Sequence, residues 1–140
     1  MALFAAAEVS AATQCHEQAE QIWQQTMVSD SIQVFVADAP DGVVATCTLI
    51  TAPNLLRGGR QHGFLENVVT HPKRRGIGYG RAVVGAALTH AWAVDCHHVL
   101  MQSGRTDPRV HTFYESLGFQ PGLRVGYVAV RPTCQVGMLR

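Results

Sequence analysis

The sequence predicts a single α/β domain spanning residues 1–140, in which a mixed and largely antiparallel sheet is flanked by helices. Composition is the first observation behind this prediction, since 140 residues with 47% hydrophobic and 15% charged residues are ordinary for one globular domain with a buried core. The second is the order of patterns along the chain, which runs helix, strands, helix, strand, helix, strand without a repeat or a low-complexity linker.

Three segments carry helix signals. Residues 10–27 place apolar side chains along one stripe of a Gln-rich and Glu-rich segment, and Ser10 is suited to cap that helix. A long helix is expected over residues 81–94, directly after a glycine-rich loop. In the third segment Asp107 is the expected N-cap, Pro108 the first helical residue, and Gly118 the left-handed residue that ends the helix.

Strands are predicted where runs rich in Val, Ile and Thr are bounded by turn residues. The expected strands are residues 32–38, 43–51, 62–69, 99–102 and 125–130. The first two are joined by an Ala-Pro-Asp-Gly turn, and the third is closed by His71 and Pro72.

Charge and cysteine spacing exclude several classes of function. A net charge of +1 argues against broad binding to nucleic acid or to an anionic membrane surface, and no segment is long enough to span a bilayer. The four cysteines are widely spaced without a Cys-x-x-Cys pair, so neither a zinc ribbon nor a redox motif is indicated. Free thiols of this kind favour a reducing, cytoplasmic setting.

Three glycines, Gly76, Gly78 and Gly80, stand between the third predicted strand and the long helix. Each weakens a first helical turn by roughly 0.5–1 kcal/mol relative to alanine, so their presence requires another reason. Bare backbone amides at a helix N-terminus bind anions, and phosphate above all. Four cationic side chains lie in the same nine residues, namely Lys73, Arg74, Arg75 and Arg81.

Other glycine-rich loops fit less well. A dinucleotide-binding loop requires Gly-x-Gly-x-x-Gly and an acidic residue about 20 positions later, whereas the spacing here is Gly-x-Gly-x-Gly and residues near 100 are apolar. A Walker A loop requires Gly-Lys-Ser/Thr after the glycines, which is absent. A strand-to-helix turn whose glycines only permit tight packing is the remaining alternative, and the clustered arginines favour phosphate binding over it.

Residues 75–80, Arg-Gly-Ile-Gly-Tyr-Gly, resemble the Arg/Gln-x-x-Gly-x-Gly/Ala signature of the GNAT acetyltransferase superfamily. Residues 66–72 resemble the strand before that signature, and residues 113–119 resemble the family's Phe-Tyr-x-x-x-Gly-Phe segment. The resemblance covers about residues 32–130. Within the superfamily, residues 54–57 and 66–69 look most like glucosamine-6-phosphate N-acetyltransferases and related small bacterial enzymes.

The resemblance implies a sheet of about six to seven strands whose central strands splay apart beside the glycine loop. Family members usually begin with a strand, for which residues 1–9 are a poor candidate, so we expect the first strand to be absent or irregular. It also implies acetyl-CoA as the cosubstrate, with no metal. The residues expected to hold acetyl-CoA are Val68, Val69, Thr70, Arg74, Arg75, Gly76, Ile77, Gly78, Tyr79, Gly80, Arg81 and Asp107. Many members carry Asn at the position of Asp107.

The implied reaction is direct acetyl transfer to a primary amine in a ternary complex, which requires a base, oxyanion donors and an acid for the thiolate. Glu66 is the candidate base because it stands in the apolar run of a central strand. Water-mediated proton transfer, or a solvated or Arg-paired carboxylate, remains an alternative. Tyr114 is the candidate acid, although its spacing with Val110, Phe113 and Leu117 also fits a buried helical stripe.

The acceptor is expected to be a small molecule, held by Asn54, Arg57, Glu66 and Asn67. Arg57 makes an anionic acceptor plausible, but a solvated loop arginine is an alternative. The resemblance also implies a homodimer. Two other functions stay open: a CoA-binding module without catalysis, and acetylation of protein lysines or N-termini.

Histidines are the remaining metal-ligand candidates. Residues 62, 71, 97, 98 and 111 show no i, i+4 pair and no His/Cys cluster with ligand spacing, so no metal site is predicted. His97 and His98 are adjacent, and on a regular strand they point to opposite faces, where they do not chelate together.

Overall fold

A four-stranded sheet in the order β1-β2-β3-β4 organises the chain in this computed structural model, which describes residues 2–7 and 16–132. Its strands are β1 (Ile32–Ala39), β2 (Gly42–Ala52), β3 (Gln61–Thr70) and β4 (Cys96–Leu100). β1 and β3 each pair with β2 antiparallel, whereas β3 pairs with β4 in parallel. The predicted mixed and largely antiparallel sheet is therefore confirmed.

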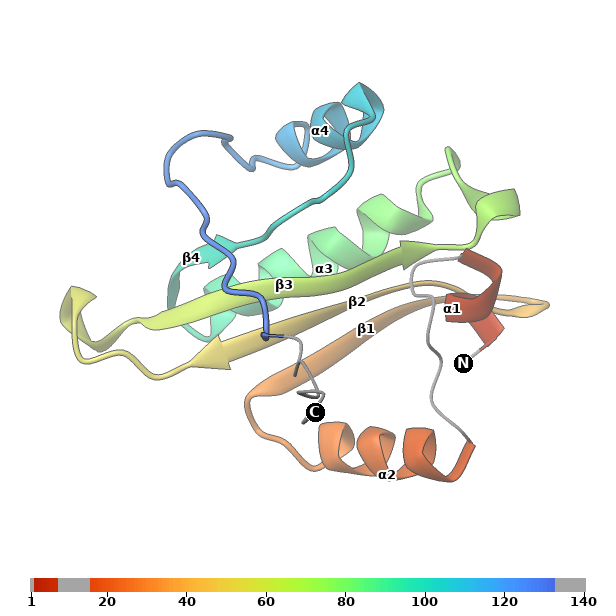
Figure 1. Cartoon of the computed structure of the whole chain (residues 1–140), viewed down its shortest axis with the longest axis horizontal. Coiled ribbons are helices and arrows are strands. Elements are labelled where there is room, and N and C mark those ends of the chain that lie inside the picture. Colours follow the sequence, from red (N-terminus) through yellow and green to blue (C-terminus); the bar gives the residue numbers. More distant parts are fainter. Residues whose placement is uncertain (1, 8–15, 133–140) are drawn as a thin grey trace, which may run out of the picture. The chain divides into compact units, whose positions relative to one another are not determined.

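The helices are α1 (Ala2–Ala7), α2 (His16–Met27), α3 (Tyr79–Ala93) and α4 (Pro108–Glu115), with short 3-10 turns at Arg57–Gly59 and Pro72–Arg74. The chain divides into two compact units, Met1–Thr106 and Asp107–Arg140. The sheet and the first three helices belong to the first unit, and α4 belongs to the second (Figure 1).

The strand count is a correction to the sequence analysis, because the described residues hold four strands and not the expected six to seven. Residues 125–130 alternate like a strand but form none, and they lie exposed. A strand needs a neighbour for its N–H and C=O groups, and no strand pairs with this segment in the described chain. Residues 2–7 form α1, which confirms that a first strand is absent there.

Local signals placed α2, α3 and α4 well, missed α1 and placed β4 less well. Asp107 caps α4 by accepting a hydrogen bond from the Arg109 amide at 2.9 Å, and Pro108 is the first helical residue, as predicted. Gly118 adopts the predicted left-handed conformation, with φ 93°. The predicted Ser10 cap lies outside the described residues. β4 begins three residues earlier than expected, at Cys96, because Asp95 at φ 59° turns the chain out of α3 directly into the strand.

The core lies between the sheet and α3, which contacts all four strands. Buried side chains of α3 meet buried strand residues, and the Cys47 thiol donates a hydrogen bond to the Val83 carbonyl at 3.3 Å. Burial raises the pKa of Cys47 to about 12, so this thiol stays protonated and unreactive in the folded protein. A smaller cluster joins Leu3 and Ala7 of α1 to Val69 of β3.

Among the described helices, none has the length and apolar character needed to cross a membrane.

Candidate functional site

A β-bulge interrupts β3 at its centre. Glu66 faces Thr48 and Val69 faces Thr46, so Asn67 and Val68 together oppose one residue of β2. Asn67 adopts φ 51°, in the left-handed region that asparagine tolerates better than most residues. A bulge of this kind bends the strand and increases its local twist, and regular pairing with β2 resumes at Val69 and Thr70.

Past the bulge, β3 has a strand partner on one side only among the residues that the structure describes. Its parallel pairing with β4 runs from Gln61 opposite Cys96 to Phe64 opposite Leu100 and then stops. Figure 1 shows the chain leaving the end of β4 and diverging from β3. Within the described chain, the backbone edge carrying Val68, Val69 and Thr70 has no strand pairing on this side, as the expected splay of neighbouring strands requires.

The glycine-rich loop is fastened to the end of β3. The His71 amide donates to the Val44 carbonyl at 2.8 Å, and the imidazole Nδ1 of His71 accepts from the Lys73 amide at 3.2 Å. Arg74 reaches the turn between β1 and β2, where its guanidinium donates to the Asp41 carboxylate at 2.6 Å. This hydrogen bond holds the pKa of Asp41 below its ordinary value and raises that of Arg74. Arg74 therefore positions the loop.

Gly76 and Gly78 adopt φ 77° and 99°, conformations that strain any other residue. No atom lies within 4 Å of a Cβ built on either, so these glycines do not serve close packing, and that alternative loses its support. Gly78 is the N-cap of α3 and offers no side chain to cap it. The amides of Tyr79 and Gly80 at the start of α3 lack acceptors within the helix, and residues 76–78 before them are exposed.

An open cavity of about 450 Å³ adjoins this loop in the first unit. It is lined by Ala6 and Ala7 of α1, by Pro72 and Arg75 of the loop, and by Arg105 from the segment after β4. The Arg75 guanidinium also donates to the Thr70 carbonyl at 3.3 Å, which draws it back toward β3. Two guanidinium groups lining one cavity beside a helix N-terminus make it suited to a phosphorylated ligand.

The predicted base and acceptor residues fall on β3 and on the loop between β2 and β3. Glu66 lies exposed, which corrects the expectation of an apolar setting, since it points to the sheet face opposite the α3 core. Asn54 holds the loop in shape, accepting from the Leu56 amide at 3.0 Å and donating to the Arg60 carbonyl at 3.3 Å. Arg57 lies exposed with φ 57°.

The second unit carries the other two predicted residues. The Asp107 carboxylate caps α4 and accepts from the Arg109 guanidinium at 2.7 Å, which raises the pKa of Arg109 above its ordinary value. Tyr114 lies half-buried, with its ring 5.0 Å from that of Phe113 and 5.7 Å from that of Phe119. The four residues of the expected stripe are partly buried, but α4 has no fully buried residue, so the stripe is less buried than expected.

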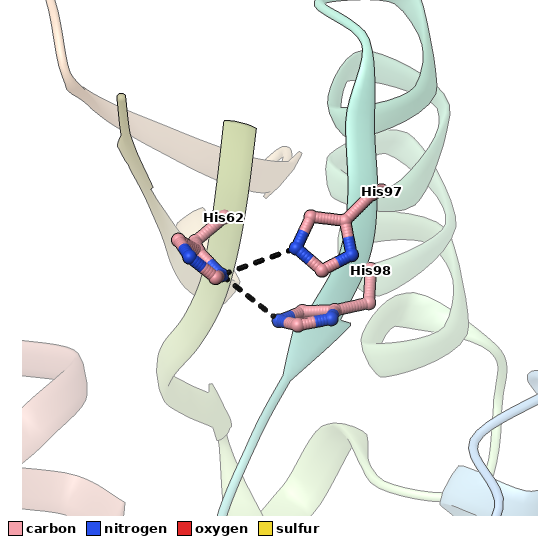
Figure 2. Close-up of side chains that lie close together, drawn as sticks. All are labelled: His62, His97 and His98. Carbon is pink, nitrogen blue, oxygen red and sulfur yellow. Dashed lines mark hydrogen bonds between the residues drawn. The ribbon is translucent and has the colours of Figure 1, made fainter. Parts of the chain in front are cut away.

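The histidines are a second correction. His62, His97 and His98 lie together, with one nitrogen of each ring within 4.8 Å of the others (Figure 2). The expectation that His97 and His98 diverge assumed a regular strand, but the β3–β4 register shifts between Gln61 and His62, where His97 is the extra residue. Alternation fails at such a shift, so neighbouring side chains approach the same point.

Two of these features carried no readable signal in the sequence. Arg105 sits in an irregular Ser-Gly-Arg-Thr segment without periodicity, so only the tertiary structure brings it to the glycine loop. The grouping of His62 with residues 97 and 98 depends on strand pairing across 35 positions. The bulge left one hint, since asparagine is among the residues enriched at positive φ.

The family model described as the Acetyltransferase (GNAT) family matches residues 2–119. Glucosamine 6-phosphate N-acetyltransferase of Trypanosoma brucei brucei is 32% identical over 88 residues, which are 63% of this chain and 58% of that protein. The chain thus spans less than two thirds of that curated relative.

Among solved structures, a candidate acetyltransferase from Agrobacterium tumefaciens str. C58 is 37% identical, with a TM-score of 0.85 over 93% of this chain and 90% of that one. The aminoglycoside N-acetyltransferase AAC(6')-Iy in complex with CoA has a TM-score of 0.67 at 16% identity over 83% of this chain and 88% of that one, a likeness of fold.

Alanine substitutions at Gly78 and Gly85 distinguish the effect of backbone strain from that of helix propensity. Gly78→Ala places a Cβ at φ 99° and is expected to destabilise the fold by about 1–2 kcal/mol. Gly85→Ala, inside α3 and also with open space around its Cβ, is expected to stabilise it by about 0.5–1 kcal/mol. Urea unfolding of both variants measures the difference, and equal effects would contradict the assigned conformation of the loop.

Proposed function

We propose that this chain, which belongs to the acetyltransferase (GNAT) family, transfers an acetyl group from acetyl-CoA to the primary amine of a small anionic acceptor. The observation that carries the proposal is the loop of Gly76 and Gly78, with bare backbone at the start of α3 and Arg75 and Arg105 lining the adjacent cavity. The relative that acts on glucosamine 6-phosphate and the fold neighbour in complex with CoA support the same activity.

In this proposal the loop binds the diphosphate of acetyl-CoA. The amides at the start of α3 donate to phosphate oxygens, and the Arg75 guanidinium neutralises their charge. Lys73 and Arg81, both exposed, add to the local positive potential, whereas Arg74 acts indirectly through Asp41. Ile77, Tyr79 and Gly80 complete the loop, and Asp107 holds the start of α4.

The bulged edge of β3 is assigned to the pantetheine arm and the thioester. Beyond Phe64 this edge lacks strand pairing in the described chain, so the backbone at Val68, Val69 and Thr70 is open to an extended ligand, apart from the Thr70 carbonyl, which accepts from Arg75. A pantetheine chain that forms hydrogen bonds with this edge, like a neighbouring strand, holds its thioester beside the bulge. An N–H group at this edge polarises the thioester carbonyl and stabilises the oxyanion that forms on attack.

Glu66 is assigned as the base and Tyr114 as the acid. The substrate ammonium gives up a proton toward Glu66, directly or through water, because only the neutral amine attacks the thioester carbon. The C–N bond forms, the C–S bond then breaks, and the departing thiolate takes the hydroxyl proton of Tyr114. The attacking nitrogen loses its second proton as it becomes the amide, and this proton passes through water to the Tyr114 phenolate. Asn67, beside Glu66 on the bulge, and the exposed Arg57 are assigned to the acceptor, whose anionic group Arg57 binds.

Release of free thiol from acetyl-CoA, measured over a panel of amines, tests this function. We expect turnover with amino sugar phosphates to exceed turnover with the matching unphosphorylated sugars, aminoglycosides, polyamines, amino acids and lysine peptides. CoA binding without turnover on any amine would indicate a binding module, and turnover confined to peptides would indicate a protein acetyltransferase. Either result contradicts the proposal.

Arg75 tests the phosphate loop. Arg75→Gln removes one of the two guanidinium groups that line the cavity and is expected to weaken CoA binding by about tenfold or more, as loss of a charge-assisted contact predicts. Titration calorimetry measures it. Arg124→Gln, at an exposed position of the second unit, is the matched control and is expected to bind CoA like the parent protein.

Tyr114 tests the acid. Tyr114→Phe keeps the ring packing against Phe113 and Phe119 and removes only the hydroxyl, so kcat is expected to fall by about 10²–10⁴-fold. The dissociation constant of acetyl-CoA is expected to change little. Tyr127→Phe, at an exposed tyrosine of the same unit, is the control. An unchanged kcat in Tyr114→Phe removes this residue from the mechanism.

A further inference from the structure

Three imidazoles converge where β3 and β4 begin. The Nδ1 atom of His62 lies 3.2 Å from Nε2 of His98 and 3.3 Å from Nε2 of His97 (Figure 2). The rings of His97 and His98 also meet, with centroids 3.8 Å apart. We refer to His62, His97 and His98 as the histidine triad.

The register shift creates this convergence. Between Gln61 opposite Cys96 and His62 opposite His98, β3 advances by one residue while β4 advances by two. His97 is therefore extra, and its side chain shares a side with its neighbour. Contacts just before the shift hold the strands in place, since Arg60 pairs with Asp95 at 2.8 Å and the Gln61 side chain donates to the Val94 carbonyl at 3.0 Å.

Hydrogen bonds alone do not satisfy the three ring nitrogens in this arrangement. A neutral imidazole has one N–H group and one lone pair, so the single Nδ1 atom of His62 forms one ordinary hydrogen bond with an approaching ring nitrogen. Here two ring nitrogens approach that atom at nearly the same distance. A cation accepts the lone pairs of all three nitrogens at once and removes the competition.

The spacing fits zinc. Zn–N bonds of about 2.0–2.1 Å at tetrahedral angles separate ligand nitrogens by about 3.3–3.4 Å. The two separations at His62 lie within about 0.2 Å of this value, and one nitrogen of each of the three rings lies within 4.8 Å of the others. Imidazole favours zinc over calcium and magnesium, which prefer oxygen ligands.

We propose that His62, His97 and His98 bind one Zn²⁺ ion, with water at the fourth coordination position. All three side chains are half-buried, which leaves one side of the ion accessible to water. The site is separate from the glycine loop, because His62 and Thr70 are eight residues apart on β3, about 26 Å at the usual rise per residue. Bound zinc links β3 to β4. Because the three ligands come together only in the folded chain, zinc binding stabilises the fold.

The test measures zinc binding to the full chain, prepared without a histidine tag and stripped with a chelator. Cys15 and Cys134, which lie outside the described residues, are replaced by Ser in every protein so that their thiols do not contribute. Calorimetry is expected to show one Zn²⁺ per chain. At a hundredfold excess over the dissociation constant, Tm is expected to rise by about 5–10 °C.

Single variants identify the ligands. His62→Gln, His97→Gln and His98→Gln are each expected to weaken zinc binding at least tenfold, while the control His111→Gln, at an exposed position on α4, binds like the parent. Absence of binding tighter than millimolar in the parent overturns the proposal. Full retention of binding in the three triad variants, or equal loss in the control, overturns it as well.

A second measurement uses only the parent protein, so it tests the proposal even where a substitution prevents folding. Diethyl pyrocarbonate modifies accessible imidazoles, and mass spectrometry locates the modified residues. Zinc is expected to protect His62, His97 and His98 and to leave the modification of His111 unchanged. Equal modification of the triad with and without zinc overturns the proposal, whatever the acetyl-transfer assays show.

Discussion

The unequal hydrogen bonding of β3 on its two sides is the constraint on which the rest of the structure depends. β3 pairs with β2 from end to end, interrupted by the bulge at Asn67, but with β4 over its first residues only. The fully paired side holds the strand in the core against α3. The other side is left with backbone groups that need a partner, and unpaired N–H and C=O groups are costly unless water or a ligand binds them. An extended ligand lying in this position completes the sheet.

The glycine loop at the end of β3 is likewise held in place by some contacts while other groups face the cavity. The loop runs from the strand into α3 through backbone conformations that residues other than glycine rarely adopt. It is anchored by the Arg74–Asp41 pair and by two hydrogen bonds of His71. Arg74 and Asp41 are both partly exposed, so the value of this pair lies more in orienting the loop than in stabilising the fold. Anchoring leaves Arg75 as the loop cation that lines the cavity. In the proposed function, Arg74 positions the loop and the adjacent Arg75 binds the ligand.

The two ends of β3 carry different chemistry. Toward its end the strand offers bare backbone and positive charge, which suit phosphates and a thioester. At its beginning, the second register shift gathers three imidazole rings from two strands, which suit a transition metal. Both features arise where the sheet departs from regular pairing, because a bulge redirects side chains and backbone that a regular ladder holds apart. The histidine triad belongs to the short parallel β3–β4 ladder, whereas the other end of β3 extends beyond that ladder.

Local chemistry in the sequence determined α3, α4, the described part of α2, the first three strands, the Asp107 cap and the glycine-rich, cationic character of residues 73–81, because each rests on neighbours within a few positions. Tertiary structure alone decided the strand count, the exposure of Glu66, the approach of Arg105 to the loop and the meeting of His62 with His97 and His98. Residues 125–130 show the difference, since alternation predicts a strand but only a partner makes one. Pairing partners and register shifts depend on contacts between distant segments, which one-dimensional periodicity does not record.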